Sequence, residues 1–161
     1  MKSKNVAVLG VMTALAMILS YLESLVPLSF AVPGVKMGLP NIVIMFALYR
    51  LSFKEACAVS IIRVVLISIL FGNTLSLAYS AAGTLVSLAV MVILKKSGRF
   101  SVTGVSVAGG VCHNAGQIAV AVLMLGTKEI AYYLPVLCVS GTVAGICIGI
   151  VSAILIEKVK I

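Results

Sequence analysis

Six apolar stretches follow one another along the chain, separated by short polar connectors. They cover residues 6–26, 38–51, 54–71, 75–94, 104–125 and 131–156. A helix crosses the hydrocarbon core of a bilayer with about 20 mainly apolar residues, at a rise of about 1.5 Å per residue. We therefore predict an all-α, polytopic membrane protein with six transmembrane helices, the second shorter than the others, forming a single domain over residues 1–161.

Composition supports this interpretation. Of the 161 residues, 62% are hydrophobic and only 10% are charged. A soluble domain carries about 25% charged residues, because it must cover its core with a wetted surface. This chain has too few for such a surface, so we expect a multi-pass protein of the plasma membrane, in contact with membrane lipid.

The basic residues predict the orientation. When successive connectors are placed on alternate sides, nine basic residues fall on one side and two on the other, while Arg63 lies within a stretch. The first group is Lys2, Lys4, Arg50, Lys54, Lys95, Lys96, Arg99, Lys158 and Lys160, and the second is Lys36 and Lys128. Because cytoplasmic connectors carry an excess of Lys and Arg, both termini are predicted to be cytoplasmic. The net charge of +8 is thereby explained by topology, and we expect no nucleic-acid partner.

Several kinds of chemistry are disfavoured. The chain contains no Asp, so it cannot form the Asp-rich magnesium–diphosphate clamp of prenyl transferases, and it has no G-x-x-x-x-G-K-[ST] phosphate loop. The four cysteines lie inside apolar stretches without a C-x-x-C motif, which is typical of small packing residues. We therefore predict no metal site, no cofactor and no catalytic residues.

Polar residues inside the apolar stretches are the first functional candidates, because polar groups at membrane depth usually face the bundle interior or a watery cavity. Arg63 lies nine residues into the third stretch, and His113 lies nine residues into the fifth, counted from the same side. At about 1.5 Å per residue, both lie about 14 Å from that end and share a depth. Asn114 is the next residue, and Gln117 shares the helix face of His113.

The segment PGVKMGLPN, residues 33–41, supplies further candidates. Gly38 permits a close backbone approach, and Pro40 suits the first turn of a helix. Lys36 and Asn41 are then expected at the outer mouth of a cavity, with Glu23 about one turn from the outer end of the first stretch. The segment is predicted to form a polar rim over that mouth.

Two interpretations of these polar residues stay open. They could form a structural hydrogen-bond network, with Arg63 satisfied by backbone carbonyls or by Glu23. Alternatively they line one outward-opening cavity with Arg63 as the main anchor, which an arginine at mid-depth favours. Arg63 and Lys36 against one nearby acid favour an anionic or carbonyl-bearing small molecule. The candidate substrate-binding residues are Glu23, Lys36, Asn41, Arg63, Asn73, His113, Asn114 and Gln117.

Small residues at four-residue spacing predict close helix contacts. One strip, Gly141-x-x-x-Gly145-x-x-x-Gly149, lies in the sixth stretch and is expected to pack within the bundle. The first stretch carries Gly10-x-x-x-Ala14 and Ala16-x-x-x-Ser20. These two strips could pack internally or receive a partner protein.

The segments SYLESLVP, PGVKMGLPNI, RVVLISILFGN, SAAGTLVSLAVM, GGVCHNAGQIAVA and YYLPVL together resemble the Gx transporter family, often labelled heptaprenyl diphosphate synthase component I. The resemblance covers nearly the whole chain in order. More distantly, the family is similar to the substrate-binding S components of energy-coupling factor transporters. Those are six-helix proteins with cytoplasmic termini and an outward-facing site under the first loop.

The resemblance implies two functions from different classes. The first is a substrate-binding subunit for uptake of a small molecule, energised by a coupling transmembrane subunit and ATPases, with Gly10 and Ala14 as the implied docking residues. The alternative is a non-catalytic membrane accessory subunit of a heptaprenyl diphosphate synthase in isoprenoid synthesis. A carrier that works alone is disfavoured, because no internal repeat is visible.

Overall fold

The computed structural model describes residues 3–25, 37–71 and 74–159, and every regular element in these ranges is helical. The elements are α1 (Ser3–Leu25), α3 (Asn41–Arg50), α4 (Phe53–Phe71), α5 (Thr74–Ser97), α6 (Val102–Leu125), the 3-10 helix η1 (Lys128–Tyr133) and α7 (Leu134–Lys158). Each predicted apolar stretch is confirmed as a helix, with ends within a few residues of those expected.

Four helical segments are long and apolar enough to cross a membrane, among the residues described. They are Val6–Leu25, Leu77–Ser97, Val102–Leu125 and Lys128–Lys158. The two other α-helices differ from them. Helix α4 has 19 residues but carries Lys54, Glu55 and Arg63. Helix α3 has only 10 residues, so at about 1.5 Å per residue it reaches about half the thickness of a hydrocarbon core.

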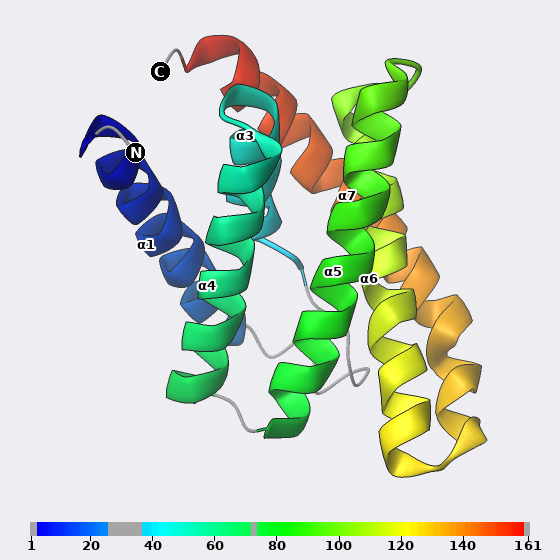
Figure 1. Cartoon of the computed structure of the whole chain (residues 1–161). Helices are drawn as coiled ribbons and strands as arrows, with labels where there is room; N and C mark the ends of the chain where they lie inside the picture. The colour runs from blue at the N-terminus through cyan, green and yellow to red at the C-terminus, as the bar shows by residue number, and fades with distance from the viewer. Residues whose placement is uncertain (1–2, 26–36, 72–73, 160–161) are drawn as a thin grey trace.

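The helices form one bundle around a central short helix. Helices α5, α6 and α7 make the most extensive contacts, α3 lies against both α7 and α4, and α1 packs mainly on α4. The start of α1 and the end of α7 lie at the same end of the bundle, together with the α3–α4 and α5–α6 connections (Figure 1). The basic residues of these segments therefore share one end, as the predicted topology requires.

The glycine strip of α7 packs against α6, as predicted. A Cβ added to Gly145 would stand 2.6 Å from Cα of Val107, and one added to Gly149 would stand 2.6 Å from Cα of Thr103. A Cβ on Gly141 would stand 3.0 Å from the Gly110 carbonyl oxygen. Only residues without a side chain permit these two backbones to approach so closely.

Helix α3 forms the core of the bundle. Its six consecutive buried residues are Val43, Ile44, Met45, Phe46, Ala47 and Leu48. Such all-round burial is typical of a helix enclosed by protein and not by lipid. At its C-terminal end, Lys95 Nζ of α5 donates to the Leu48 carbonyl over 2.5 Å, and Arg50 donates to the Ile156 carbonyl of α7. The short helix is thus bonded to α5 and to α7 at the end where the termini lie.

The two small-residue strips of α1 face opposite ways. Ala16 is fully buried and Ser20 nearly so, while Gly10 and Ala14 are exposed on the outside of the bundle. A Cβ on Gly10 would meet no described atom within 4 Å. The Ala16/Ser20 strip therefore packs inside the bundle. The Gly10/Ala14 strip is left uncovered by the described part of the chain.

Candidate functional site

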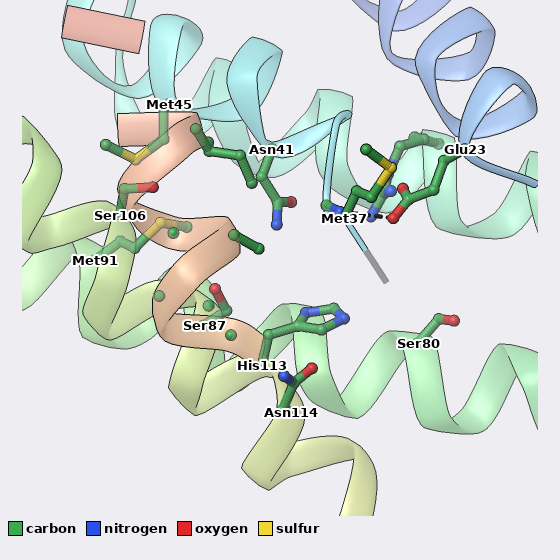
Figure 2. Close-up of a pocket in the computed structure, with 18 residues that line it drawn as sticks. Glu23, Met37, Asn41, Met45, Ser80, Ser87, Met91, Ser106, His113 and Asn114 are labelled. Carbon is green, nitrogen blue, oxygen red and sulfur yellow. Dashed lines mark hydrogen bonds between the residues drawn. The ribbon is translucent and has the colours of Figure 1, made fainter. Parts of the chain in front are cut away.

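A cavity of about 70 Å³ lies inside the bundle, and all six α-helices in the described part of the chain contribute to its wall. Its lining residues are Glu23, Met37, Gly38, Asn41, Met45, Arg63, Ser80, Ser87, Met91, Ser106, Gly109, Gly110, His113, Asn114, Gly141, Ala144, Gly145 and Ile148. Figure 2 shows that Asn41 and His113 project toward the same space from opposite sides. The wall thus combines hydrogen-bonding side chains with methionines and close-packed glycines.

Arg63 supplies the positive charge of the site, from the middle of α4. Its Nη1 donates a long hydrogen bond of 3.4 Å to Oγ of Ser20, and that hydroxyl donates to the Ala16 carbonyl over 2.8 Å. Its Nε is buried and finds no acceptor among the described residues. Since a guanidinium carries five N–H donors, this side chain is far from satisfied by the described protein.

Glu23 ties the end of α1 to the segment before α3. Its Oε1 accepts a hydrogen bond of 2.6 Å from the backbone N–H of Gly38. Gly38 has a φ of 73°, and a Cβ there would stand 3.0 Å from Cδ1 of Ile148 and 3.2 Å from Nδ2 of Asn41. The predicted close approach at Gly38 is therefore confirmed, and its positive φ is a conformation that favours glycine.

Helix α3 begins at the cavity. Pro40 occupies the N-cap position with φ −60°, and Asn41 is the first helical residue, close to the helix start that the sequence predicts for Pro40. The Asn41 N–H donates to the Gly38 carbonyl over 2.8 Å, forming a turn before the helix. Because Asn41 lines the cavity while Arg50 lies beside the end of α7, the helix runs from the middle of the bundle to one end.

Asn114 has a packing role as well as a place in the wall. Its Nδ2 donates to the Leu137 carbonyl over 2.6 Å, which joins α6 to α7 inside the bundle. The side chain is buried, and a Cβ on Gly141 would stand 2.9 Å from the same nitrogen. Asn114 therefore fits the interpretation of a structural hydrogen-bond network, and it lines the cavity as well.

The structure brings together five of the predicted site residues, namely Glu23, Asn41, Arg63, His113 and Asn114. Gln117 does not line the cavity, and its Cγ lies 2.8 Å from the position that a Cβ on Gly83 would take in α5. His113 also approaches Gly83, with Cε1 at 3.1 Å from the same position. The helix face that His113 and Gln117 share therefore packs against α5, and of these two residues His113 lines the cavity. Lys36 and Asn73 lie outside the described residues.

The lining serines and methionines were not predicted from the sequence. Ser80, Ser87 and Ser106 line the cavity together with Met45 and Met91. Serine is inconspicuous in an apolar helix, because its hydroxyl can bond to the carbonyl of the preceding turn. The available signal was spacing: Ser80 and Ser87 are two turns apart on α5, and small or polar residues recur on α6 at positions 106, 109, 110 and 113.

A protein-family model described as heptaprenyl diphosphate synthase component I matches residues 12–155. The chain belongs to this family. All the lining residues of the cavity, from Glu23 to Ile148, fall inside the matched range. No curated protein matches the chain significantly, and no solved structure does so.

The described cavity wall carries one charge of each sign and several hydrogen-bonding groups. Among the described lining residues, Glu23 is the single carboxylate and Arg63 the single permanent cation. No group of three or more His, Cys, Asp or Glu in the described ranges is placed to hold a metal ion. The remaining polar groups are hydroxyls, amides and one imidazole, all of which are capable of hydrogen bonding.

Proposed function

We propose that this protein is a non-catalytic membrane subunit, component I of a heptaprenyl diphosphate synthase, that binds a small molecule in its central cavity. The observation that supports binding is the buried Arg63, whose Nε lacks an acceptor in a cavity walled by six helices. Buried polar groups in proteins are almost always paired, so an unpaired one at a cavity indicates a missing partner. Family membership supports the assignment to the synthase.

The absence of catalysis is proposed on chemical grounds. Prenyl chain elongation requires carboxylates that hold Mg²⁺ on a diphosphate. The whole chain has four acidic residues, and Glu23 alone among them belongs to the described cavity wall. We therefore assign the chemical step to a partner subunit. This chain is assigned membrane attachment and ligand binding. The proposed topology has six membrane passes and both termini in the cytoplasm.

A second candidate is the substrate-binding subunit of an uptake system, working with a coupling transmembrane subunit and ATPases. The specific observation that favours it is the outer face of α1, where Gly10 and Ala14 are exposed and no described residue covers Gly10. A smooth strip of this kind permits close approach of a helix from another protein. Both candidates share the ligand-binding cavity and differ in the partner.

Affinity purification of the tagged, full-length protein from its native membranes tests both points. Proteins in the eluate are identified by mass spectrometry, and small molecules are extracted from it and identified separately. A prenyl synthase subunit in the eluate supports the first candidate, and a coupling subunit with ATPases supports the second. A cavity ligand should be lost in Arg63→Ala and retained in Arg99→Ala, an exposed matched control. If no small molecule is present with the wild-type protein and absent with Arg63→Ala, the binding function is contradicted.

A further inference from the structure

We infer that the ligand of this cavity carries an oxyanion, a carboxylate or a phosphate, which binds between the guanidinium of Arg63 and the first turn of α3. The inference rests on the proposed binding function and names the chemical class of the group that is bound. Three observations support it, on Arg63, on α3 and on the size of the cavity.

The first observation is the lack of an anionic partner for Arg63. The guanidinium lies in the middle of α4, its Nε is buried without an acceptor, and Oγ of Ser20 is the one acceptor found for it among the described residues. A buried cation is costly unless it is paired with an anion and hydrogen-bonded. Carboxylates and phosphates match the planar fork of arginine with two parallel hydrogen bonds. An oxyanion would therefore supply both the missing negative charge and the missing hydrogen-bond acceptors.

The second observation is the direction of α3. This helix begins at the cavity with Asn41 and extends away from it to Arg50. The N-terminal end of a helix carries a partial positive charge of about half an elementary charge. Short helices that begin inside a membrane protein commonly direct this end at anionic groups of a substrate. The N–H groups of residues 41–44 already donate to carbonyls of residues 38–40. Helix α3 therefore contributes the field of its dipole, and Arg63 supplies the hydrogen-bond donors.

Glu23 is the internal competitor of such a ligand. Its carboxylate is the one acidic group in the described wall, and it is held away from the guanidinium by the N–H of Gly38 at 2.6 Å. Held there, it lowers the cost of the unliganded Arg63 without forming a contact ion pair among the described residues. Its negative charge must weaken the binding of an anion in the same cavity, and this consequence is testable.

The third observation is the volume. At roughly 10–15 Å³ for each water molecule, a cavity of about 70 Å³ holds about five to seven waters. This space suits one carboxylate or one phosphate group with its first bonded atoms. A longer substituent must lie outside the described cavity. The wall is therefore a site for a head group.

Nitrogen-15 NMR of the arginine side chains provides a direct test. The chain has three arginines, Arg50, Arg63 and Arg99, so selective labelling gives at most three Nε–H signals, and Arg63→Lys assigns that of Arg63. Full-length protein in phosphatidylcholine nanodiscs is titrated with inorganic phosphate, with acetate and with the neutral acetamide. We expect a saturable shift of the Arg63 signal with phosphate or acetate and none with acetamide, whereas the exposed Arg50 and Arg99 change only gradually with ionic strength.

A second arm separates a soluble anion from a lipid head group. In nanodiscs that contain phosphatidic acid, a head group in the cavity shifts the Arg63 signal before any anion is added. An unshifted Arg63 signal in those discs, followed by saturation with phosphate, indicates a soluble ligand. Either result supports the oxyanion. An Arg63 signal that no anion moves, or that moves only in parallel with Arg50 and Arg99, overturns it.

Glu23→Gln tests the electrostatic part and preserves an acceptor for the Gly38 N–H. We expect its affinity for phosphate to rise about threefold or more, because a negative charge has left the cavity. Glu157→Gln, at the exposed end of α7, is the matched control and should leave the affinity unchanged. Equal affinities in Glu23→Gln and wild type would refute the proposed electrostatics. A neutral molecule that co-purifies in an Arg63-dependent way would refute the oxyanion and leave the binding function standing.

Discussion

The contact between α6 and α7 makes a sharp prediction for a single methyl group. In Gly145→Ala, the new Cβ would stand 2.6 Å from Cα of Val107 and 3.1 Å from the Ser106 carbonyl oxygen. Both are backbone atoms, so no side-chain rotation relieves the overlap. The two helices must separate by several tenths of an ångström or more, and the neighbouring contact of Gly149 with α6 must loosen with them.

The magnitude follows from two opposing terms. Alanine gains up to about 1 kcal/mol over glycine in helix propensity. Overpacking a close contact costs about 1–3 kcal/mol, occasionally more, and a clash between two backbones belongs to the upper part of that range. We therefore expect a net loss of about 1–2 kcal/mol, which for a chain of this size lowers Tm by roughly 2–8 °C.

The chain has no Trp and four Cys, so a thiol-reactive dye is the suitable probe of thermal unfolding in detergent. Cys57, Cys112 and Cys138 are partly buried and report the opening of the bundle. Gly10→Ala is the matched control, because a Cβ there meets no described atom within 4 Å, and its Tm should stay the same or rise slightly. Equal Tm values for Gly145→Ala and Gly10→Ala would refute the close packing of α6 and α7.

Three further predictions concern ligand, partner and topology. Arg63→Ala should weaken binding of the co-purified ligand about ten- to a hundredfold, because a charge-assisted hydrogen bond contributes about 1.5–3 kcal/mol. Arg63→Lys should restore only part of the lost affinity. Wild-type affinity in well-folded Arg63→Ala would make Arg63 a scaffold residue. A Gly10→Leu, Ala14→Leu double variant should lose its membrane partner in co-purification and keep its ligand, and unchanged co-purification would exclude docking on this strip. In a cysteine-free background, an impermeant thiol reagent applied to intact cells should label a cysteine at Lys128 and not one at Lys96, and the reverse would contradict the topology.

The helices could be predicted closely because membrane insertion imposes one physical requirement, a long apolar stretch with its backbone bonded internally. The burial of α3 inside the bundle could not be predicted in the same way. Its sequence, NIVIMFALYR, is as apolar as a lipid-facing helix, since burial in protein and exposure to lipid select the same residues. Its burial follows from contacts with α4 and α7 that are distant in the chain.

The site was predictable to the extent that polar groups are costly in lipid. Arg63 and His113 were identified by that cost, and both line the cavity. Gln117 carries a similar cost but lies against Gly83, because the rotation of α6 relative to α5 decides which polar side chain reaches the cavity. Ser80 and Ser87 line the wall without such a signal, since a serine hydroxyl costs little in a helix.

The position of the cavity is related to the place where α3 begins. Helix α3 begins at Asn41, and Gly38 before it lines the cavity and donates its N–H to Glu23 of α1. Residues 37–40, directly before α3, are not helical, and such backbone at membrane depth is tolerated where it is buried in protein or lines a cavity. The cavity therefore lies where α3 begins, between the start of this short helix and the wall residues that the five other described α-helices contribute.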